Sequence, residues 1–271
     1  MTRLTIVIVA FNAGEDLAGT LVSLTTAPPS TSHEIVVVDN ASTDGAPELV
    51  RARFPGVRIV EAGANLGFAR ANNLAIRGSA SELVLLLNPD TIVLAGAIDQ
   101  LVACLDSQPG VAGVGPRIVD ANGRAELSWG DRVTPWSEQR RKTLVQRDQD
   151  GDSTAATAID RETRAARDVA WVTGACLLVR RSDAELAGLL DERYFLYMED
   201  VDFCDAIRAR GRRVRFEPSV EIVHLRGRSG AASGGAAERA WHTSHLAYYR
   251  KHLPLWAPLL AAYQRLRAAK E

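Results

Sequence analysis

Several features are scarce or missing in this sequence, and each absence argues against a class of protein. No hydrophobic run reaches the roughly 18 to 20 apolar residues that a membrane-spanning helix needs. The three cysteines, Cys104, Cys176 and Cys204, are an odd number without C-x-x-C spacing, which favours reduced thiols over a disulfide framework or a zinc site. The formal net charge of −1 gives no indication of a nucleic-acid partner.

Two further absences concern the first residues of the sequence. The chain after Met1 enters a short β-like run without the apolar stretch and cleavage site of a signal peptide, so we expect a cytoplasmic protein. After this run the sequence reads Phe11-Asn12-Ala13-Gly14-Glu15-Asp16, where a dinucleotide-dependent dehydrogenase would carry G-x-G-x-x-G. The mismatch argues against a dehydrogenase.

The sequence does contain an alternation of strand-like and helix-like segments. Four apolar runs have the composition of strands buried on both faces, at 4–11, 34–39, 57–61 and 83–87. Helices are predicted between them: Leu17, Leu21 and Leu24 have near-helical spacing, and two more helices follow at 47–54 and 66–77. This order predicts an α/β fold with a central, mostly parallel sheet flanked by helices. Ligands of such sheets bind beyond the carboxyl ends of the strands.

The second half of the sequence has a weaker pattern. Residues 138–168 are polar and poor in large apolar side chains, which predicts either a solvated, mobile loop or a surface helix. Residues 169–179 are predicted as one strand with a close backbone approach at Gly174. The remaining predicted elements are a helix at 199–210, short strands at 214–216 and 220–224, and a helical tail at 238–271 interrupted by Pro254 and Pro258.

Polar side chains follow the predicted strands at the edge where a ligand would bind. Asp39 could accept hydrogen bonds from a nucleobase or ribose, or belong to a turn in which Ser42 or Asp44 caps the next helix. Asp90 could hold Mg²⁺ or Mn²⁺ with water and substrate phosphates, or lie in an Asn-Pro-Asp β-turn. His224 ends a predicted strand, where a metal or phosphate role competes with a structural one.

Two predicted helix starts carry further candidates. The start at Asn65-Leu66-Gly67 could face a diphosphate, or Asn65 could simply cap the helix, although the paired Asn72-Asn73 is unusual inside a helix. Glu199, Asp200 and Asp202 could be ordinary first-turn acids. The apolar residues just before them suggest instead a partly buried site in which carboxylates have raised pKa values and one acts as a base.

Taken in order, six segments of the chain resemble the inverting glycosyltransferases of family 2, which have the GT-A fold. They include Val37-Val38-Asp39-Asn40-Ala41-Ser42-Thr43-Asp44-Gly45, Asn65-Leu66-Gly67-Phe68-Ala69, Asn88-Pro89-Asp90, Trp171-Val172-Thr173-Gly174-Ala175 and Met198-Glu199-Asp200-Val201-Asp202, after an initial Val7-Ile8-Val9-Ala10-Phe11-Asn12. The resemblance is greatest to the rhamnosyltransferase-like branch. It implies a Rossmann-like nucleotide-diphospho-sugar transferase fold, with a catalytic domain over 1–236 (a donor half at about 1–116 and an acceptor half at about 117–236) and a tail over 237–271.

The resemblance also implies roles for residues. Asp200 would be the catalytic base, with Glu199 in support, and Asp90 and His224 would hold Mg²⁺ or Mn²⁺, with Asn88 in place of the first acid of the family's D-x-D signature. Donor-binding residues would be Ala10, Asn12, Asp39, Asn40, Asn65, Gly67, Asn72, Asn88 and Asp90, with Asp39 on the nucleobase. Acceptor-binding residues would be Trp171, Gly174, Ala175 and Asp202.

The expected activity is the inverting transfer of a sugar from a nucleotide-diphosphate donor, with dTDP-L-rhamnose first and UDP-hexoses open. The acceptor would be a saccharide or a polyprenyl-diphosphate-linked saccharide, in the synthesis of a cell-surface polysaccharide or glycoconjugate. A non-catalytic nucleotide-sugar-binding or scaffold protein is the alternative, which the joint presence of Asp39, Asp90, Glu199 and Asp200 disfavours.

The tail is basic and rich in aromatic residues. It carries Arg239, Arg250, Lys251, Arg265, Arg267 and Lys270 against Glu238 and Glu271. Such a helical segment could lie on an anionic membrane, which would make the protein peripheral on the inner face of the plasma membrane. Alternatively, it could pack onto the catalytic domain or onto the second subunit of a homodimer.

Overall fold

The computed structural model describes residues 2–225 and 235–268 of the chain. Its strands are β1 (Leu4–Ala10), β2 (His33–Asp39), β3 (Arg58–Glu61), β4 (Leu83–Leu87), β5 (Thr91–Val93), β6 (Val111–Val119), β7 (Ala125–Glu126), β8 (Trp129–Gly130), β9 (Arg167–Val169), β10 (Trp171–Val172), β11 (Cys176–Arg180) and β12 (Arg213–His224). Its helices are α1 (Gly14–Thr26), α2 (Ala46–Arg53), α3 (Gly67–Arg77), α4 (Ala97–Asp106), α5 (Pro135–Gln149), α6 (Ser153–Glu162), α7 (Arg181–Ala187), α8 (Glu199–Ala209), α10 (Ala236–His252) and α11 (Ala257–Ala268).

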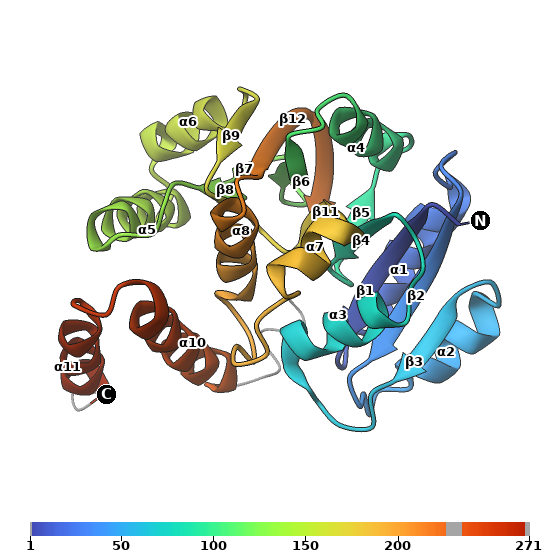
Figure 1. Ribbon diagram of the computed structural model, residues 1–271, viewed down its shortest axis with the longest axis horizontal. Coiled ribbons are helices and arrows are strands. Elements are labelled where there is room, and N and C mark those ends of the chain that lie inside the picture. The colour runs from blue at the N-terminus through green and yellow to red at the C-terminus, as the bar shows by residue number, and fades with distance from the viewer. Residues whose placement is uncertain (1, 226–234, 269–271) are drawn as a thin grey trace.

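One large mixed sheet runs through the catalytic part of the chain in the order β3-β2-β1-β4-β11-β6-β12-β5 (Figure 1). Pairing is parallel from β3 to β4 and between β6 and β12, whereas β11 and β5 run antiparallel to their neighbours. The predicted α/β fold with a central sheet is therefore confirmed, and the parallel pairing is concentrated in the first half of the chain, from β1 to β4.

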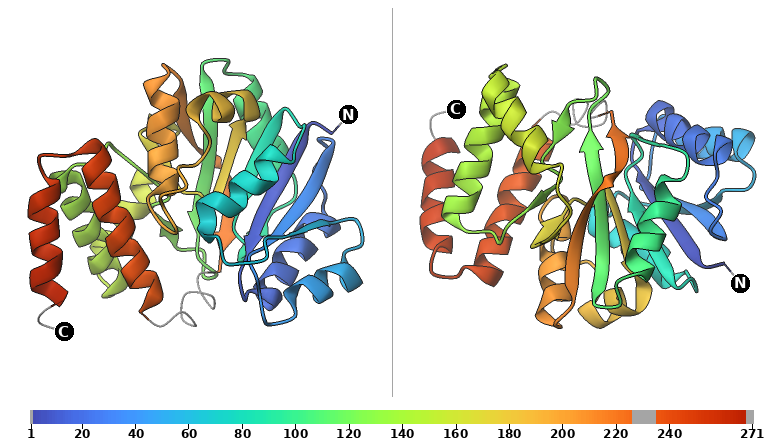
Figure 2. Two further views of the ribbon diagram at one scale, coloured as in Figure 1. Left: turned by 60° about the horizontal axis from the view of Figure 1, so that its bottom comes forward. Right: turned by 90° about the horizontal axis from the view of Figure 1, so that it is seen from above.

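Side chains of β1 alternate between two cores, one on each face of the sheet. Ile6 and Ile8 point to the face covered by α1, α2 and α4, and Val7 and Val9 to the face covered by α3, α7 and α8. The leucines predicted at helical spacing in α1 belong to the first core. Helices thus flank the sheet on both sides, as the two views in Figure 2 show. This leaves the carboxyl ends of the strands for a ligand.

The polar segment at 138–168 consists mainly of helices, so its surface-helix alternative is confirmed and the loop alternative is wrong. Helix α5 has no fully buried residue, which explains the absence of an apolar period. Thr134 caps α5 and Asp152 caps α6, each by accepting hydrogen bonds from backbone N–H groups of the first turn.

Two predicted boundaries near the acceptor half were wrong. Residues 169–179 form three strands instead of one, because β9 pairs with β12, β10 pairs with β8 in a separate small sheet, and β11 enters the main sheet. The two short strands predicted at 214–216 and 220–224 are one strand, β12, with a register irregularity between Glu217 and Glu221. Such irregularities let one strand serve two regions of a sheet.

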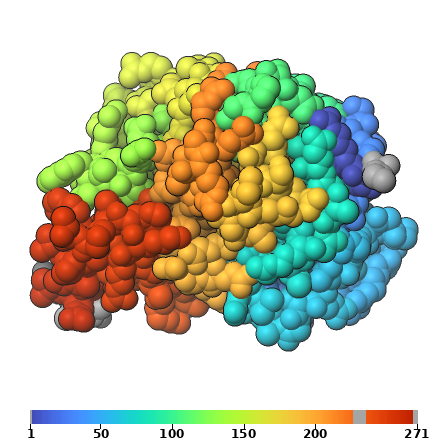
Figure 3. Space-filling view, in the orientation of Figure 1, coloured from blue at the N-terminus to red at the C-terminus, as the bar shows by residue number. Residues whose placement is uncertain are grey.

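The tail forms two helices, α10 and α11, at the end of the molecule opposite the donor half (Figure 3). Pro254 lies in the break between them, whereas Pro258 lies in the first turn of α11, where proline is tolerated. Tyr248 and Tyr249 of α10 are buried against the residues just before α8. For α10, packing onto the catalytic domain is therefore confirmed. None of the described helices is both long and apolar enough to cross a bilayer.

Candidate active site

At the carboxyl ends of β1 and β2, predicted donor residues build a set of tight turns. The Asn40 N–H donates to the Ala10 carbonyl across the two strands, at 2.8 Å. The buried Asp39 carboxylate accepts from the Ser42 N–H at 3.2 Å. Asp39 therefore closes a turn after β2, as expected from the alternative to nucleobase or ribose binding. The same carboxylate ends a strand of a parallel sheet, which is where a nucleotide would be recognised.

Asn12 and Asp44 connect the loops that follow β1 and β2. Asn12 has a positive φ of 50°, its side-chain oxygen accepts from the Thr43 N–H at 2.8 Å, and its N–H donates to Ser42 Oγ. Asp44 accepts from the first N–H groups of both α1 and α2, at Gly14 and Ala46. The capping role expected for Asp44 is thus present at two helix starts.

The start of α3 is tied to the protein through its first two N–H groups. Asn65 Oδ1 accepts from the Gly67 N–H at 3.1 Å and from Asn40 Nδ2 at 2.9 Å, so these two amides hold the loop. The Phe68 N–H donates to the Phe195 carbonyl at 2.7 Å. These two donors already have acceptors in the protein, and the diphosphate-facing role of this helix start stays a prediction.

Gly67 is the point where this loop meets the segment before α8. Its φ is +79°, and a Cβ at this position would lie only 2.3 Å from the Phe195 carbonyl oxygen. Any other residue would be strained and would clash with backbone. Gly67 thus joins the two halves of the site.

The paired asparagines of α3 are buried and hydrogen-bonded within the protein. Asn72 donates to the Phe68 carbonyl one turn earlier, at 2.9 Å. Asn73 donates to the Leu190 carbonyl and accepts from the Leu190 N–H, and it also bonds Glu192. Asn73 thus anchors the loop after α7, and donor binding by Asn72 stays a prediction.

The candidate metal ligands lie together at the ends of β4 and β12. Pairing of His224 with Thr91 places the imidazole beside Asp90, with Nε2 3.1 Å from Asp90 Oδ1 and 3.3 Å from Asn88 Nδ2. Glu126 of β7, which sequence reasoning missed, lies 3.7 Å from the other ring nitrogen. The described residues contain no group of three or more His, Cys, Asp or Glu side chains arranged to hold a metal.

The donor set nevertheless fits a partly protein-bound Mg²⁺ or Mn²⁺. Burial lowers the pKa of His224, but its hydrogen bonds to Asp90 and Glu126 outweigh that effect and raise the pKa to about 9. A metal at Nε2 would have to displace this proton. One carboxylate, one imidazole and the Asn88 amide oxygen would leave positions for water and diphosphate oxygens, as hard cations prefer.

The predicted base lies at the start of α8, after two strained residues. Tyr197 and Met198 have positive φ values of 70° and 68°, which non-glycine residues seldom adopt and which often occur at functional sites. Asp200 Oδ2 accepts from the Gly174 N–H at 2.9 Å, and Oδ1 accepts from the Val201 N–H at 2.8 Å. The close approach predicted at Gly174 is confirmed, since a Cβ there would meet the Phe68 ring at 3.1 Å.

The two carboxyl groups have raised pKa values, as expected for a partly buried site. Burial raises the pKa of Asp200, although its backbone donors and the nearby Arg141 guanidinium lower it in part. Burial together with the charge of Asp200 raises the pKa of Glu199 well above its usual range. The Oε2 atom of Glu199 is buried and has no hydrogen-bond partner among the described residues. Such an unsatisfied buried oxygen is costly and is typical of a functional group.

Gly174 and Ala175 connect the base to the metal edge. While the Gly174 N–H binds Asp200, the carbonyl of Ala175 accepts from the Asn88 N–H at 2.9 Å. Two consecutive residues therefore fix Asp200 relative to the end of β4.

Arg141 lies against Trp171, and its positive charge acts on Asp200. The Trp171 Nε1–H donates to the Asp131 carbonyl at 3.1 Å, and the Arg141 guanidinium lies over the indole ring, 4.7 Å from its centroid. Arg141 also binds the Leu127 and Trp129 carbonyls and so anchors α5 here. Sequence reasoning missed Arg141, although Thr134-Pro135 is a helix-start signal for α5.

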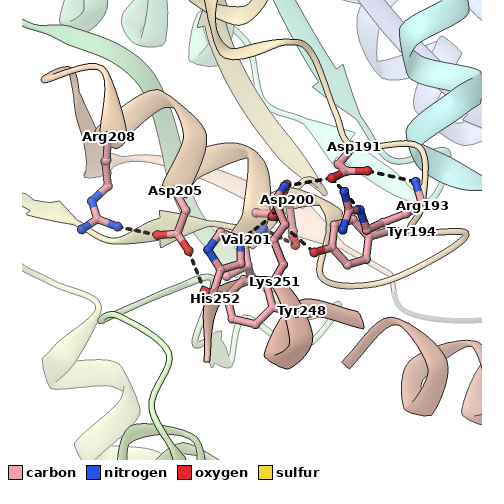
Figure 4. A network of polar contacts seen from close by, with 11 residues as sticks. Asp191, Arg193, Tyr194, Asp200, Val201, Asp205, Arg208, Tyr248, Lys251 and His252 are labelled. Carbon is pink, nitrogen blue, oxygen red and sulfur yellow. Dashed lines mark hydrogen bonds and ion pairs between the residues drawn. The ribbon is translucent and has the colours of Figure 1, made fainter. Parts of the chain in front are cut away.

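Asp202 belongs to a polar network that joins α8 to the tail, in which Tyr248, Lys251 and His252 lie beside Tyr194 and Asp205 (Figure 4). Its buried carboxylate lies 2.8 Å from Lys251 Nζ, 2.6 Å from His252 Nε2 and 3.2 Å from Tyr194 Oη. Tyr248 of the same tail helix donates to Asp205. Tyr194 and residues of the tail thus surround the Asp202 carboxylate, and its acceptor-binding role stays a prediction.

Comparison with known proteins places this geometry in a family. The sequence profile described as "Glycosyl transferase family 2" matches residues 5–162. The N-acetylglucosaminyl-diphospho-decaprenol L-rhamnosyltransferase of Mycobacterium tuberculosis is 33% identical over 269 residues, which cover 94% of this chain and 87% of that protein. The low-salt glycan biosynthesis hexosyltransferase Agl10 of Haloferax volcanii is 25% identical, over 82% of this chain and 66% of its own length.

Solved structures show the same fold. Mannosyltransferase PcManGT from Pyrobaculum calidifontis, in complex with GDP-Man and Mn²⁺, superposes with a TM-score of 0.62 at 21% identity, over 96% of this chain and 68% of that one. TarS 1–349 of S. aureus, in complex with UDP-GlcNAc, gives 0.61 at 15% identity, over 89% and 64%. The predicted family, GT-A fold and rhamnosyltransferase-like branch are confirmed, and the chain belongs to glycosyltransferase family 2.

Proposed function

We propose that the protein transfers L-rhamnose, with inversion, from dTDP-L-rhamnose to a saccharide carried on a polyprenyl diphosphate. The donor and acceptor classes are supported by the 33% identity, along nearly the whole chain, to an N-acetylglucosaminyl-diphospho-decaprenol L-rhamnosyltransferase. The observation that carries the mechanism is the Gly174-Ala175 link, which fixes Asp200 beside the edge formed by Asn88 and Asp90.

The roles of the residues follow from their surroundings. Asp200 accepts the proton of an acceptor hydroxyl as that oxygen attacks the anomeric carbon from the face opposite the diphosphate. Its raised pKa makes it a better proton acceptor than an ordinary aspartate. Asp90 and His224 would hold Mg²⁺ or Mn²⁺, which when bound neutralises charge developing on the leaving nucleotide. Asp39 binds the nucleobase or ribose at the end of β2.

A panel of nucleotide sugars tests the donor. With Mn²⁺ present and donor at about 100 times its dissociation constant, dTDP-L-rhamnose should stabilise the protein by about 2.7 kcal/mol, or roughly 5–10 °C in Tm. UDP-hexoses should give smaller shifts. A larger shift with a UDP-hexose would reject the donor assignment, and a product of retained anomeric configuration would reject the mechanism.

Metal removal tests the Asp90–His224 edge separately. A chelator should weaken dTDP-L-rhamnose binding and abolish transfer, and Mn²⁺ should restore both. Asp90→Asn should weaken Mn²⁺ binding in the same assay. Donor binding that is unchanged by the chelator would remove the metal-bridging role while leaving Asp200 as the base.

A further inference from the structure

The two helices of the tail have opposite surroundings. Helix α10 is packed onto the catalytic domain through its tyrosines and through Lys251 and His252. Helix α11 instead exposes large apolar side chains: Leu259 is 63% exposed, Tyr263 59% and Leu266 67%. At 3.6 residues per turn these three positions fall within roughly 60° of one another around the helix. A row of this kind on one side of a surface helix is unusual for a face that meets only water.

The apolar row continues beyond α11. Leu255 is 89% exposed in the turn before the helix, and Trp136 at the start of α5 is 74% exposed. The Trp136 ring packs edge-on against Trp256, with 6.0 Å between ring centroids, so the start of α5 and the turn before α11 present their aromatic residues together. We call this set the α11 face; it comprises Trp136, Leu255, Leu259, Tyr263 and Leu266.

The charges of α11 itself have one sign. Arg265 and Arg267 flank Leu266, both are exposed, and residues 257–268 contain no acidic side chain. A second copy of α11 would bring more positive charge and no negative charge to meet it. Acidic lipid headgroups would meet apolar, aromatic and cationic side chains with the matching chemistry.

We propose that the α11 face docks the protein on the surface of an anionic lipid bilayer, with α11 lying in the plane of the interface. The inference rests on the proposed function, because a polyprenyl-linked acceptor is held in a bilayer. Helix α10 links the face to the site, since Lys251 and His252 bind Asp202, two residues beyond Asp200. Docking through α11 therefore sets the height of Asp200 above the bilayer.

Vesicle flotation of the full chain tests the proposal. Vesicles of phosphatidylcholine mixed with phosphatidylglycerol should carry the wild type to the top of the gradient. The variant Leu259→Ser/Tyr263→Ser/Leu266→Ser should bind at least about tenfold more weakly. A matched control, Val22→Ser/Leu94→Ser/Leu186→Ser, removes three exposed apolar side chains from the catalytic domain and should bind like the wild type.

The charge contribution is tested with Arg265→Gln/Arg267→Gln. Binding to vesicles with phosphatidylglycerol should fall by about fivefold per arginine, and binding to pure phosphatidylcholine should not change. Equal loss on both vesicles would contradict the electrostatic part of the proposal.

Three outcomes would overturn the docking surface: no flotation of the wild type, equal flotation of the wild type and the α11 variant, or equal losses in the α11 and control variants. A wild-type dimer that becomes monomeric in the α11 variant without loss of vesicle binding would assign the face to a second copy. The thermal shift with dTDP-L-rhamnose keeps the two proposals separate. If that shift fails while vesicle binding depends on α11, only the rhamnosyl-transfer proposal falls.

Discussion

The donor edge and the acceptor edge of this site are built in different ways. Donor-side contacts join the loops that follow neighbouring strands of the sheet, as between Asn12 and Thr43, 31 residues apart, beside the local turn that Asp39 closes with Ser42. Acceptor-side contacts join α8 to other parts of the fold: Asp200 meets Gly174 across 26 residues, and Asp202 meets Lys251 of the tail across 49. Pairing of β1 with β2 therefore brings the loops of the donor edge together, whereas the acceptor edge exists only once the sheet, α8 and the tail have packed together.

The two edges also differ in how they carry charge. On the acceptor edge, Glu199 and Asp200 lie next to each other with raised pKa values, and Glu199 has an oxygen without a hydrogen-bond partner in the described structure. Two strained residues, Tyr197 and Met198, precede them. Buried carboxyl groups and strained backbone both lower the stability of the folded protein, and such costs are common at active sites.

The largest expected effect separates the two edges by function. Asp200→Asn should lower the rate of transfer by about 10²- to 10⁴-fold, because the amide cannot take the acceptor proton. Donor binding should not change, since the Gly174 N–H can still donate to the amide oxygen. The measurements are kcat with a rhamnosyl donor and the donor-induced shift in Tm.

A matched control for this variant is Asp183→Asn, which alters a carboxylate paired with Arg212 outside both edges. It should keep transfer within a few-fold of the wild type, or on the order of 1 kcal/mol in the barrier. Near-normal transfer by Asp200→Asn would show that the base lies elsewhere.

The contact between Gly67 and Phe195, which connects the donor edge to the acceptor edge, is tested by a substitution at Gly67. Gly67→Ala should destabilise the protein by about 3–5 kcal/mol, since it adds a clash with Phe195 to the strain of a positive φ. Gly123→Ala is the control, because Gly123 has a φ of +77° with no atom within 4 Å of a Cβ there. It should cost only about 1–2 kcal/mol. Urea unfolding measures both, and equal costs would mean that the Gly67–Phe195 contact does not join the edges.

A smaller effect on stability is expected at the contact between the tail and α8. A double-mutant cycle with Asp202→Asn and Lys251→Met should give a coupling energy of about 1–3 kcal/mol, because the Asp202 carboxylate is buried. The exposed pair Glu48–Arg51 is the control and should couple by about 0.3 kcal/mol. Urea unfolding of the four variants of each pair gives both values. A coupling for Asp202 and Lys251 as small as the control would show that the tail rests on α8 without holding it.

The same contrast explains what the sequence could predict. The strands before residue 90 and the leucines of α1 follow simple periods, so the donor half and the polar residues at its strand ends were found. Neither spacing nor composition could bring His224 to Asp90, because that contact depends on the pairing of β12 with β5, 134 residues later in the chain. Glu126 lies in a two-residue strand, β7, which has no period to detect.

Two neighbouring acids show the limit most clearly. Asp200 and Asp202 look alike in sequence, and the helical period places them on different sides of α8. Only the packed structure shows that Asp200 binds the Gly174 N–H whereas Asp202 binds Lys251 and His252 of the tail. The contact of Asn72 is likewise visible only in the structure, where its side chain donates to the Phe68 carbonyl of its own helix. Residue type predicts chemistry, and long-range packing decides where that chemistry is used.

The smallest expected effect concerns the buried charge of Glu199. Its pKa is raised in the folded protein, so the folded state binds the proton more tightly than the unfolded state. Stability should then be highest below the usual pKa of a glutamate and should fall as pH rises toward the raised value. Glu199→Gln should remove this fall and stabilise the protein at neutral pH by about 1 kcal/mol, while transfer declines less than in Asp200→Asn. Urea unfolding from about pH 4.5 to 8 measures the difference. Parallel curves for wild type and variant would mean that the Glu199 charge costs the fold nothing, and that the acceptor edge is no more strained than the donor edge.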